Sequence, residues 1–169
     1  GNVLPSQNPI NLAENIAMVS QMLNGRVFAG FARGYQPRWV NVLGQQIRGL
    51  DGAFSEESYE ALKKDLYYDH FEIIKKCWQK DAFSHHSPHW QIPAPNTKWA
   101  AAEVTRNYGT GIDANDMLTE IGTVPATYNK RMPDLFQPFS VSESSIRWAM
   151  ENNCVPVTIL THPEVALSQ

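Results

Sequence analysis

Helical and strand-like patterns alternate along most of this chain, and that alternation constrains its fold more than any single motif. A helical pattern begins at the Asn8-Pro9 pair and stops at Gly25, and an apolar strand, Val27 to Ala32, follows. Asparagine caps a helix well, and proline suits the first turn because its missing N–H is not needed there. Repeated helix–strand units predict an α/β protein with a parallel sheet and right-handed crossovers.

The alternation resumes further along the chain. Ser55 is typical of a helix cap and predicts a long helix that reaches about Gln79. The strand Val27 to Ala32 has no polar face, so we expect it to be buried, as parallel strands covered by helices are. The later expected elements are a strand Leu135 to Ser140, a helix from Ser142 to about Asn152, a strand Val155 to Leu160 and a short helix opened by His162-Pro163.

The stretch between residues 81 and 133 has a different character. Prolines interrupt it and no helical period persists, which predicts an insertion of short strands and loops. A hairpin through Phe83 to Ile92 is expected within it. We interpret Asp113 as the start of a short solvated helix, and Glu103 and Arg106 as an exposed ion pair.

Composition limits the class of protein. The 169 residues suit one domain, with 43% apolar and 18% charged residues, and the net charge of −3 argues against nonspecific nucleic-acid binding. No apolar run approaches the roughly 20 residues that cross a bilayer, so no membrane association is expected. Cys77 and Cys154 lack metal-site or redox-motif spacing. Two reduced thiols in a cytoplasmic protein are therefore the expectation.

Two features at strand ends are suited to an anion. Arg33 directly follows an expected strand, where α/β proteins bind ligands, and its guanidinium suits a phosphate or carboxylate. Ser142 and Ser145 open an expected helix, whose free N–H groups attract anions. A strand-end arginine can equally form an ion pair, and most serine caps bind only their own backbone. Neighbouring strand ends could direct both features at one phosphate.

Three histidines, His85, His86 and His89, lie close together in the insertion. Pro88 interrupts any helical spacing, and no cysteine or carboxylate cluster adjoins them in the sequence. Catalytic zinc needs convergent ligands with supporting partners. We therefore expect no metal and interpret the segment as a loop that lines a substrate entrance.

A set of segments carries a more specific signal through its order along the chain. These are Asn2 to Pro9, Ala13-Glu14 and Gln21-Met22, Gly25 to Tyr35, Ile73-Ile74 with Trp78, Phe83, His89-Trp90, Phe139 to Ala149, and Val155 to Leu160. In this order they resemble the bacterial-luciferase-like flavin monooxygenases, and the resemblance covers nearly the whole chain.

The resemblance implies a TIM-type (β/α)8 barrel of the bacterial luciferase type, of which this chain would form about the central half. Residues 1–169 would be one partial barrel domain with the insertion at about 81–133. The family's first two strands would precede Gly1 and its last strands would follow Gln169. About four of the eight barrel strands would then be present.

The implied activity is that of a monooxygenase that uses reduced FMN and molecular oxygen to oxygenate a small organic substrate. The FMN would be bound non-covalently and supplied by a flavin reductase. A homo-oligomer, or pairing with the remainder of the barrel, is expected. Two alternatives stay open: a non-catalytic flavin-binding relative, and a TIM-type enzyme acting on a phosphate-bearing substrate.

The resemblance also assigns roles at the FMN phosphate. Arg33 would pair with the phosphate, and Ser142 and Ser145 would hold it from the start of a helix. The main chain of Val141 would lie near the same group.

The remaining implied roles concern the rest of the flavin. Tyr35 would line the ribityl chain. Thr161 and His162, just past a strand, would lie toward the isoalloxazine ring. His162 is the one local candidate for a supporting catalytic role, because histidine exchanges protons near neutral pH.

Overall fold

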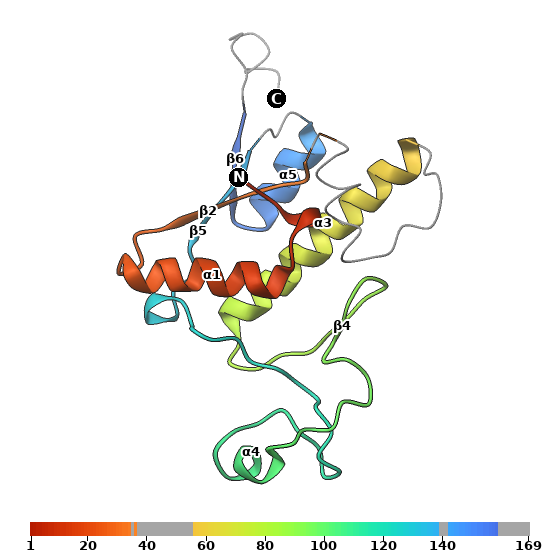
Figure 1. The fold of residues 1–169 in the computed structure, drawn as a ribbon. Coiled ribbons are helices and arrows are strands. Elements are labelled where there is room, and N and C mark those ends of the chain that lie inside the picture. The colour runs from red at the N-terminus through yellow and green to blue at the C-terminus, as the bar shows by residue number, and fades with distance from the viewer. Residues whose placement is uncertain (35, 37–55, 139–141, 159–169) are drawn as a thin grey trace, which may run out of the picture.

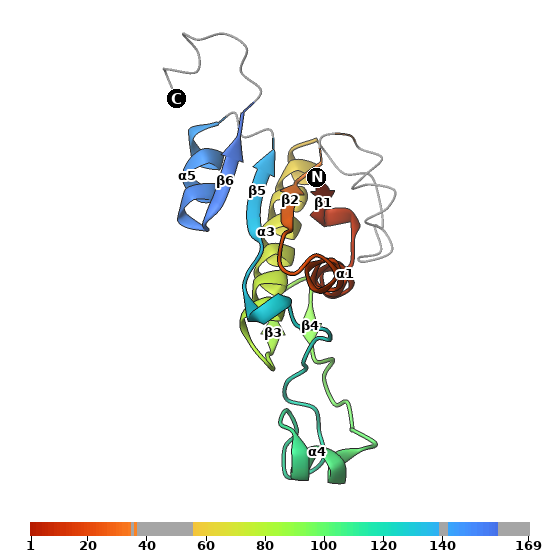
Figure 2. The ribbon, with the colours of Figure 1, turned by 90° about the vertical axis from the view of Figure 1, so that its left-hand side faces the viewer.

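The computed structural model describes residues 1–34, 36, 56–138 and 142–158, and its centre is a parallel four-stranded sheet. The strands lie in the order β1-β2-β5-β6, so neighbours in the sheet follow one another along the chain (Figure 2). The elements are β1 (Asn2–Val3), η1 (Leu4–Ser6), α1 (Pro9–Met22), β2 (Phe28–Ala32), α3 (Glu56–Gln79), β3 (His85–His86), β4 (Gln91–Ile92), α4 (Ala102–Tyr108), η3 (Tyr128–Lys130), β5 (Asp134–Pro138), α5 (Glu143–Glu151) and β6 (Cys154–Val157). The prediction of an α/β fold with a parallel sheet is confirmed.

The helix boundaries follow the local signals in the sequence. The Asn8 side chain accepts hydrogen bonds from Ile10 N at 3.0 Å and Asn11 N at 3.1 Å, which caps α1 as expected. Helix α3 ends at Gln79, and α5 begins after its cap Ser142. The predicted continuations of β5 and β6 beyond Pro138 and residue 158, and the short helix after His162, lie outside the described residues.

Within the described residues, helices cover one face of the sheet, and the other face carries exposed apolar side chains. Ala29, Phe31 and Leu135 point into the core beneath the helices, whereas Phe28 on the opposite face is 70% exposed. On that open face the Phe28 ring meets the Phe136 ring edge to face, with centroids 5.2 Å apart. The expectation that β2 is buried throughout is therefore wrong. An all-apolar strand does not reveal which of its faces lacks a covering layer.

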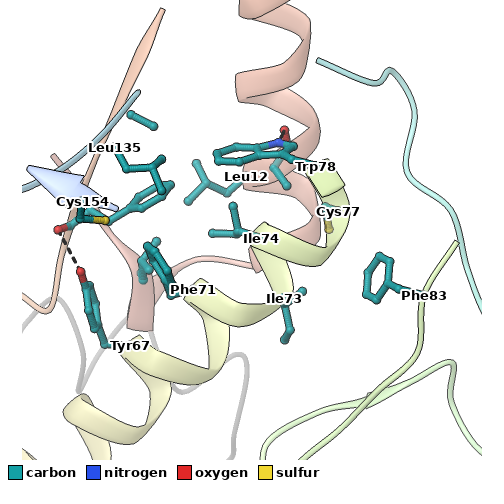
Figure 3. Close-up of a cluster of buried hydrophobic side chains, with 14 of the residues drawn as sticks. Leu12, Tyr67, Phe71, Ile73, Ile74, Cys77, Trp78, Phe83, Leu135 and Cys154 are labelled. Atoms are coloured by element: carbon teal, nitrogen blue, oxygen red, sulfur yellow. Dashed lines mark hydrogen bonds between the residues drawn. The ribbon is translucent and has the colours of Figure 1, made fainter. Parts of the chain in front are cut away.

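Helix α3 contributes more residues to the covered core than any other element. Tyr67, Phe71, Ile74 and Trp78 point from one side of this helix toward Leu12, Leu135 and neighbouring side chains (Figure 3). The Trp78 indole also donates a hydrogen bond to Ala13 O at 3.0 Å, which fixes α3 against α1. Burial of a large apolar side chain contributes about 1.5–3 kcal/mol, so this face of α3 adds substantially to the stability of the sheet layer.

A buried histidine joins α3 to two other segments. His70 is fully buried, and its Nδ1 lies 2.7 Å from Leu4 O, just after β1. The Trp90 indole of the hairpin donates to His70 Nε2 at 2.9 Å. These partners define a neutral ring that donates through Nδ1 and accepts through Nε2. Burial lowers the pKa of His70 to about 4, against an ordinary value of 6.5.

The insertion contains the predicted hairpin and a projecting arm. Strands β3 and β4 pair antiparallel, with His85 opposite Ile92, which confirms the hairpin. Residues 93–120, called the arm below, carry α4 and extend away from the sheet and its helices (Figures 1 and 2). An isolated bridge between Phe83 and Ile121, with both N···O distances at 2.9 Å, lies at its base.

Two expectations within the arm are wrong. Asp113 caps a turn and not a helix, because its carboxylate accepts from Asn115 N and Met117 N, both at 2.8 Å. Arg106 pairs with Asp116 and not with Glu103. The short helix α4 was not expected either. Pairing between distant parts of the arm, such as Leu118 N with Thr97 O at 2.9 Å, decides these conformations.

Acid should destabilise the fold through His70. Below pH 6.5 the unfolded chain binds a proton that the buried ring excludes until about pH 4, so this contribution is complete above 6.5 and declines as pH falls. At roughly 1.4 kcal/mol per pH unit, the loss approaches about 3 kcal/mol. Urea unfolding at about pH 7.5, 5.5 and 4.5 should show a shallower decline for His70→Asn than for the wild type. Equal declines in the free energy of unfolding of the two proteins would contradict this prediction. His86→Asn, which changes an exposed ring, is the control and should decline as the wild type does.

The open face of the sheet should drive association when residues 1–169 are expressed alone. Phe28, Val155 and Val157 would remain in water, and the sheet edges would be unpaired. Light scattering should report oligomers, and Phe28→Ser with Val155→Thr should reduce their size. Met22→Ser, which changes an exposed residue on α1, is the matched control. A monomer at all concentrations would overturn this expectation.

Candidate anion-binding site

The candidate site lies where neighbouring parallel strands end. β2 pairs with β5 in parallel, with Gly30 opposite Phe136, and β5 pairs with β6, with Pro138 opposite Val157. The carboxyl ends of all three strands therefore lie at one edge of the sheet (Figure 2). Neighbouring strands are about 4.8 Å apart. Arg33, directly after β2, thus lies at the same end of the sheet as Pro138, the last residue of β5.

The first turn of α5 is built around Ser142. The Ser142 Oγ accepts from Ser145 N at 3.3 Å and donates to Ser145 Oγ at 2.8 Å, and Ser144 Oγ lies 3.2 Å away. Ser142 and Ser144 are exposed. The N–H groups of a first helical turn lack intrahelical acceptors, and the helix dipole makes this end positive. The start of α5 therefore presents amides and hydroxyls to an anion.

A carboxylate at the same helix end is compensated locally. Glu143 is the first residue of α5, and its Oε1 accepts from the Arg147 guanidinium at 2.8 Å, one turn further on. The hydrogen bond that Arg147 donates to Glu143 raises the pKa of Arg147, so this exposed arginine stays charged. The Glu143 charge, which would repel a phosphate, is thereby partly offset.

The backbone on both sides of Arg33 is attached to α3. The Tyr67 hydroxyl donates to Phe31 O at 3.4 Å, and Lys63 Nζ donates to Gly34 O at 3.2 Å. Gly34 has φ +80°, a conformation that a residue with Cβ adopts poorly. Arg33 itself is exposed and forms no ion pair with any residue that the structure describes.

The structure describes three of the seven predicted site residues. Arg33 directly follows β2, and Ser142 and Ser145 lie in the first turn of α5, the helix between β5 and β6. Their donors, a guanidinium with hydroxyls and helix amides, suit a phosphate. The other four predicted residues lie outside the described residues, and these are Tyr35, Val141, Thr161 and His162.

The sequence interpretation missed two residues that border this site. Lys63 and Tyr67 lie one helical turn apart on α3, on the side that also carries the buried Leu62 and Leu66. A lysine within an apolar stripe was the available signal, because exposed positions on the opposite side of a helix are the usual place for this residue.

The histidine segment has partners of its own. His85 Nε2 lies 2.7 Å from Asp69 Oδ1, and the Ser87 hydroxyl donates to Asp69 Oδ2 at the same distance. Lys76 Nζ is 3.2 Å from His85 Nδ1. Within the described ranges no group of three or more histidine, cysteine or acidic side chains is arranged to hold a metal ion. These contacts attach the hairpin to α3; whether the segment also lines a substrate entrance stays a prediction.

A cavity of about 370 Å³ lies at the other end of α3, lined by Cys77, Trp78, Lys80, Thr123 and Lys130 among others. Burial raises the pKa of the Cys77 thiol to about 12, so this sulfur is protonated near neutral pH. Cys77 and Cys154 are both free and buried. A protonated, buried thiol is a poor nucleophile, and the cavity is remote from the strand ends that carry Arg33.

None of the helices in the described part of the chain is both long and apolar enough to cross a membrane.

Comparison with known proteins gives one consistent group of relatives. No protein-family model matches the chain. The chain is 26% identical over 161 residues to 3,6-diketocamphane 1,6-monooxygenase of Pseudomonas putida, covering 95% of this chain and 39% of the relative. It is 28% identical over 170 residues to 2,5-diketocamphane 1,2-monooxygenase 2 of the same organism, and this match covers 99% of this chain and 39% of the relative. The chain thus spans about 39% of the length of these curated relatives.

Solved structures show the same fold. The chain aligns, with a TM-score of 0.64 and 22% identity, to the oxygenating constituent of 3,6-diketocamphane monooxygenase from Pseudomonas putida, a type II Baeyer-Villiger monooxygenase in complex with FMN, over 98% of this chain and 38% of that one. A monooxygenase from Streptomyces bottropensis aligns with a TM-score of 0.63 and 15% identity, over 99% of this chain and 40% of that monooxygenase. The fold of this chain is therefore that of a segment of these monooxygenases.

Proposed function

We propose that this chain is the central part of an FMN-dependent monooxygenase that oxygenates a small organic substrate with molecular oxygen. The observation that carries the proposal is that Arg33 follows β2 and a serine-capped helix follows β5, the strand paired in parallel with β2. The diketocamphane monooxygenases, which the chain matches along nearly its whole length, support the reaction class.

The proposal includes a complete TIM-type barrel, to which residues 1–169 contribute one partial domain with its insertion. Strands in this sheet follow chain order and run parallel, with helices on one face, which is the arrangement of a barrel wall. The open face with Phe28 and Val155 would then become the barrel interior. Further strands would pair with the exposed edges.

The described residues fit the phosphate end of FMN. Arg33 would bind it through a guanidinium that presents two parallel donors, and Ser142 and Ser145 would add hydroxyls and helix amides. On the basis of the family resemblance, we propose that the main chain of Val141 contacts the same group and that Tyr35 contacts the ribityl chain. The cofactor would be held without a covalent bond.

Chemistry at the flavin ring is divided between the cofactor and the protein. When bound, reduced FMN would supply the electrons that activate oxygen. Thr161 and His162 would lie toward the ring, with His162 holding or passing a proton at an imidazole nitrogen. The walls of the completed barrel would exclude water from the substrate.

The expected partners follow from this chemistry. A flavin reductase would deliver reduced FMN, and a homo-oligomer or the remainder of the barrel would cover the open surfaces. No role for nucleic acid or a membrane is proposed. We also propose a cytoplasmic location, supported by the free thiols of Cys77 and Cys154.

Two other functions use the same anion site. A TIM-type enzyme acting on a phosphate-bearing substrate would also place its phosphate at Arg33 and Ser142. A flavin-binding relative without activity would bind FMN there and oxygenate nothing. The full-length protein should be yellow and should release FMN on denaturation under our proposal, and a colourless, flavin-free protein that rejects added FMN would favour the phosphate-bearing substrate.

Arg33→Ala should weaken FMN binding by about 1.5–3 kcal/mol, the usual contribution of a hydrogen bond to a charged group. Arg33→Lys should recover only part of this loss, because an ammonium lacks the planar pair of donors. Fluorescence titration of the full-length protein measures both, with riboflavin, which has no phosphate, as the control ligand. Equal FMN affinity in wild type and both variants would remove Arg33 from the site.

Oxygen consumption should depend on a flavin reductase. With NADH, FMN and a reductase supplied, the full-length protein should convert an organic substrate to an oxygenated product in step with oxygen uptake above the reductase background. Candidate small ketones and other organic substrates would be screened by mass spectrometry for the gain of one oxygen atom. FMN binding without any product across such a screen would favour the inactive flavin-binding relative.

A further inference from the structure

Two side chains of α3 hold the backbone on either side of Arg33. Lys63 and Tyr67 are one helical turn apart, and each donates to a main-chain carbonyl at the end of β2. The bond from Lys63 reaches Gly34 O, directly after Arg33, and the bond from Tyr67 reaches Phe31 O, two residues before it. The peptide that carries Arg33 is therefore attached at both ends to the helix that forms the core.

The burial of Lys63 sets it apart from an ordinary helix lysine. Its residue exposure is only 4%, whereas the adjacent Lys64 is exposed. A buried ammonium carries a large desolvation cost unless charged and polar partners compensate it. Glu60, one turn earlier, forms an ion pair with Lys63, and Gly34 O accepts a hydrogen bond from it at 3.2 Å. An apolar side chain could fill this space without that cost.

We propose that Lys63 is a positioning residue that fixes the Arg33-Gly34 turn for phosphate recognition, with Tyr67 as the second attachment; this inference rests on the proposed FMN function. Gly34 has φ +80°, and its carbonyl lies beyond the last paired residue of β2. Without the ammonium this carbonyl loses the donor that α3 supplies, and the turn gains freedom. Restricting the turn before binding reduces the entropy lost when Arg33 binds the phosphate.

The test compares two flavins across matched variants of the full-length protein. Lys63→Met keeps the aliphatic stem and removes the ammonium, Lys63→Arg restores a charged donor, and Lys64→Met is the control. Lys63→Met should weaken FMN binding about tenfold, in line with a hydrogen bond from a charged group, and leave riboflavin binding unchanged. Lys63→Arg should recover part of the FMN affinity, and Lys64→Met should match the wild type.

A double mutant separates positioning from a general structural role. In an Arg33→Ala background, Lys63→Met should cause no further loss of FMN affinity, because its effect operates through the guanidinium. Equal losses for FMN and riboflavin, or a full tenfold loss without Arg33, would overturn the inference. If Lys63→Met fails to fold, Tyr67→Phe, which keeps the ring and removes the bond to Phe31 O, provides the same comparison.

The outcomes also distinguish this inference from the proposed function. If Arg33→Ala weakens FMN binding and neither Lys63→Met nor Tyr67→Phe does, the positioning role is wrong and the phosphate site stands. If Arg33→Ala leaves FMN binding unchanged as well, the proposed site itself is wrong, and the positioning role is overturned with it.

Discussion

The packing of α3 against the covered face of the sheet is the interaction on which the other features depend. Phe71 meets Phe31 edge to face with ring centroids 6.0 Å apart, and Trp78 stacks on the same Phe31 ring at 6.3 Å. The Trp148 ring of α5 packs against the Phe71 ring with centroids 4.9 Å apart. Helix α3 therefore contacts both the sheet and the neighbouring helix α5. Aromatic groups with this geometry add directional preference to the hydrophobic effect, which fixes the rotation of α3 about its axis.

That rotation determines where the polar side chains of α3 lie. Lys63 and Tyr67 meet the end of β2, and His70 meets the carbonyl after β1. Further along, Trp78 reaches Ala13 of α1. A single helix thus attaches the first two strands and the first helix to a common support. The backbone on either side of Arg33 is consequently attached to the helix that packs into the core.

Much of the fold could be predicted from short-range signals. The Asn8 cap, the long helix that ends at Gln79 and the Ser142 cap each depend on a few neighbouring residues, and all three are confirmed. The errors arose where distant residues decide the outcome. Asp113 forms a turn because the arm pairs with itself, and no local pattern shows that the side of β2 bearing Phe28 is uncovered.

In the candidate site, too, the features with local signals could be predicted and those that depend on distant residues could not. The positions of Arg33 after a strand and of Ser142 at a helix start could be predicted, because such positions are visible in the sequence. For Lys63 the apolar stripe was a signal of burial, but the partner was not visible, because the contact with Gly34 joins residues 29 positions apart.

The attachment of the arm suggests how such a protein can diversify. Beyond the bridge between Lys98 and Met117, the distal residues return almost to their point of departure, since Trp99 N donates to Asp116 O at 2.8 Å. The entropy of closing a loop grows only slowly with its length, so segments of different size could be exchanged between these two positions at small cost. The hairpin and α3 would keep their contacts throughout. Insertions or deletions at this point would thus alter the arm while the strand ends retain their arrangement.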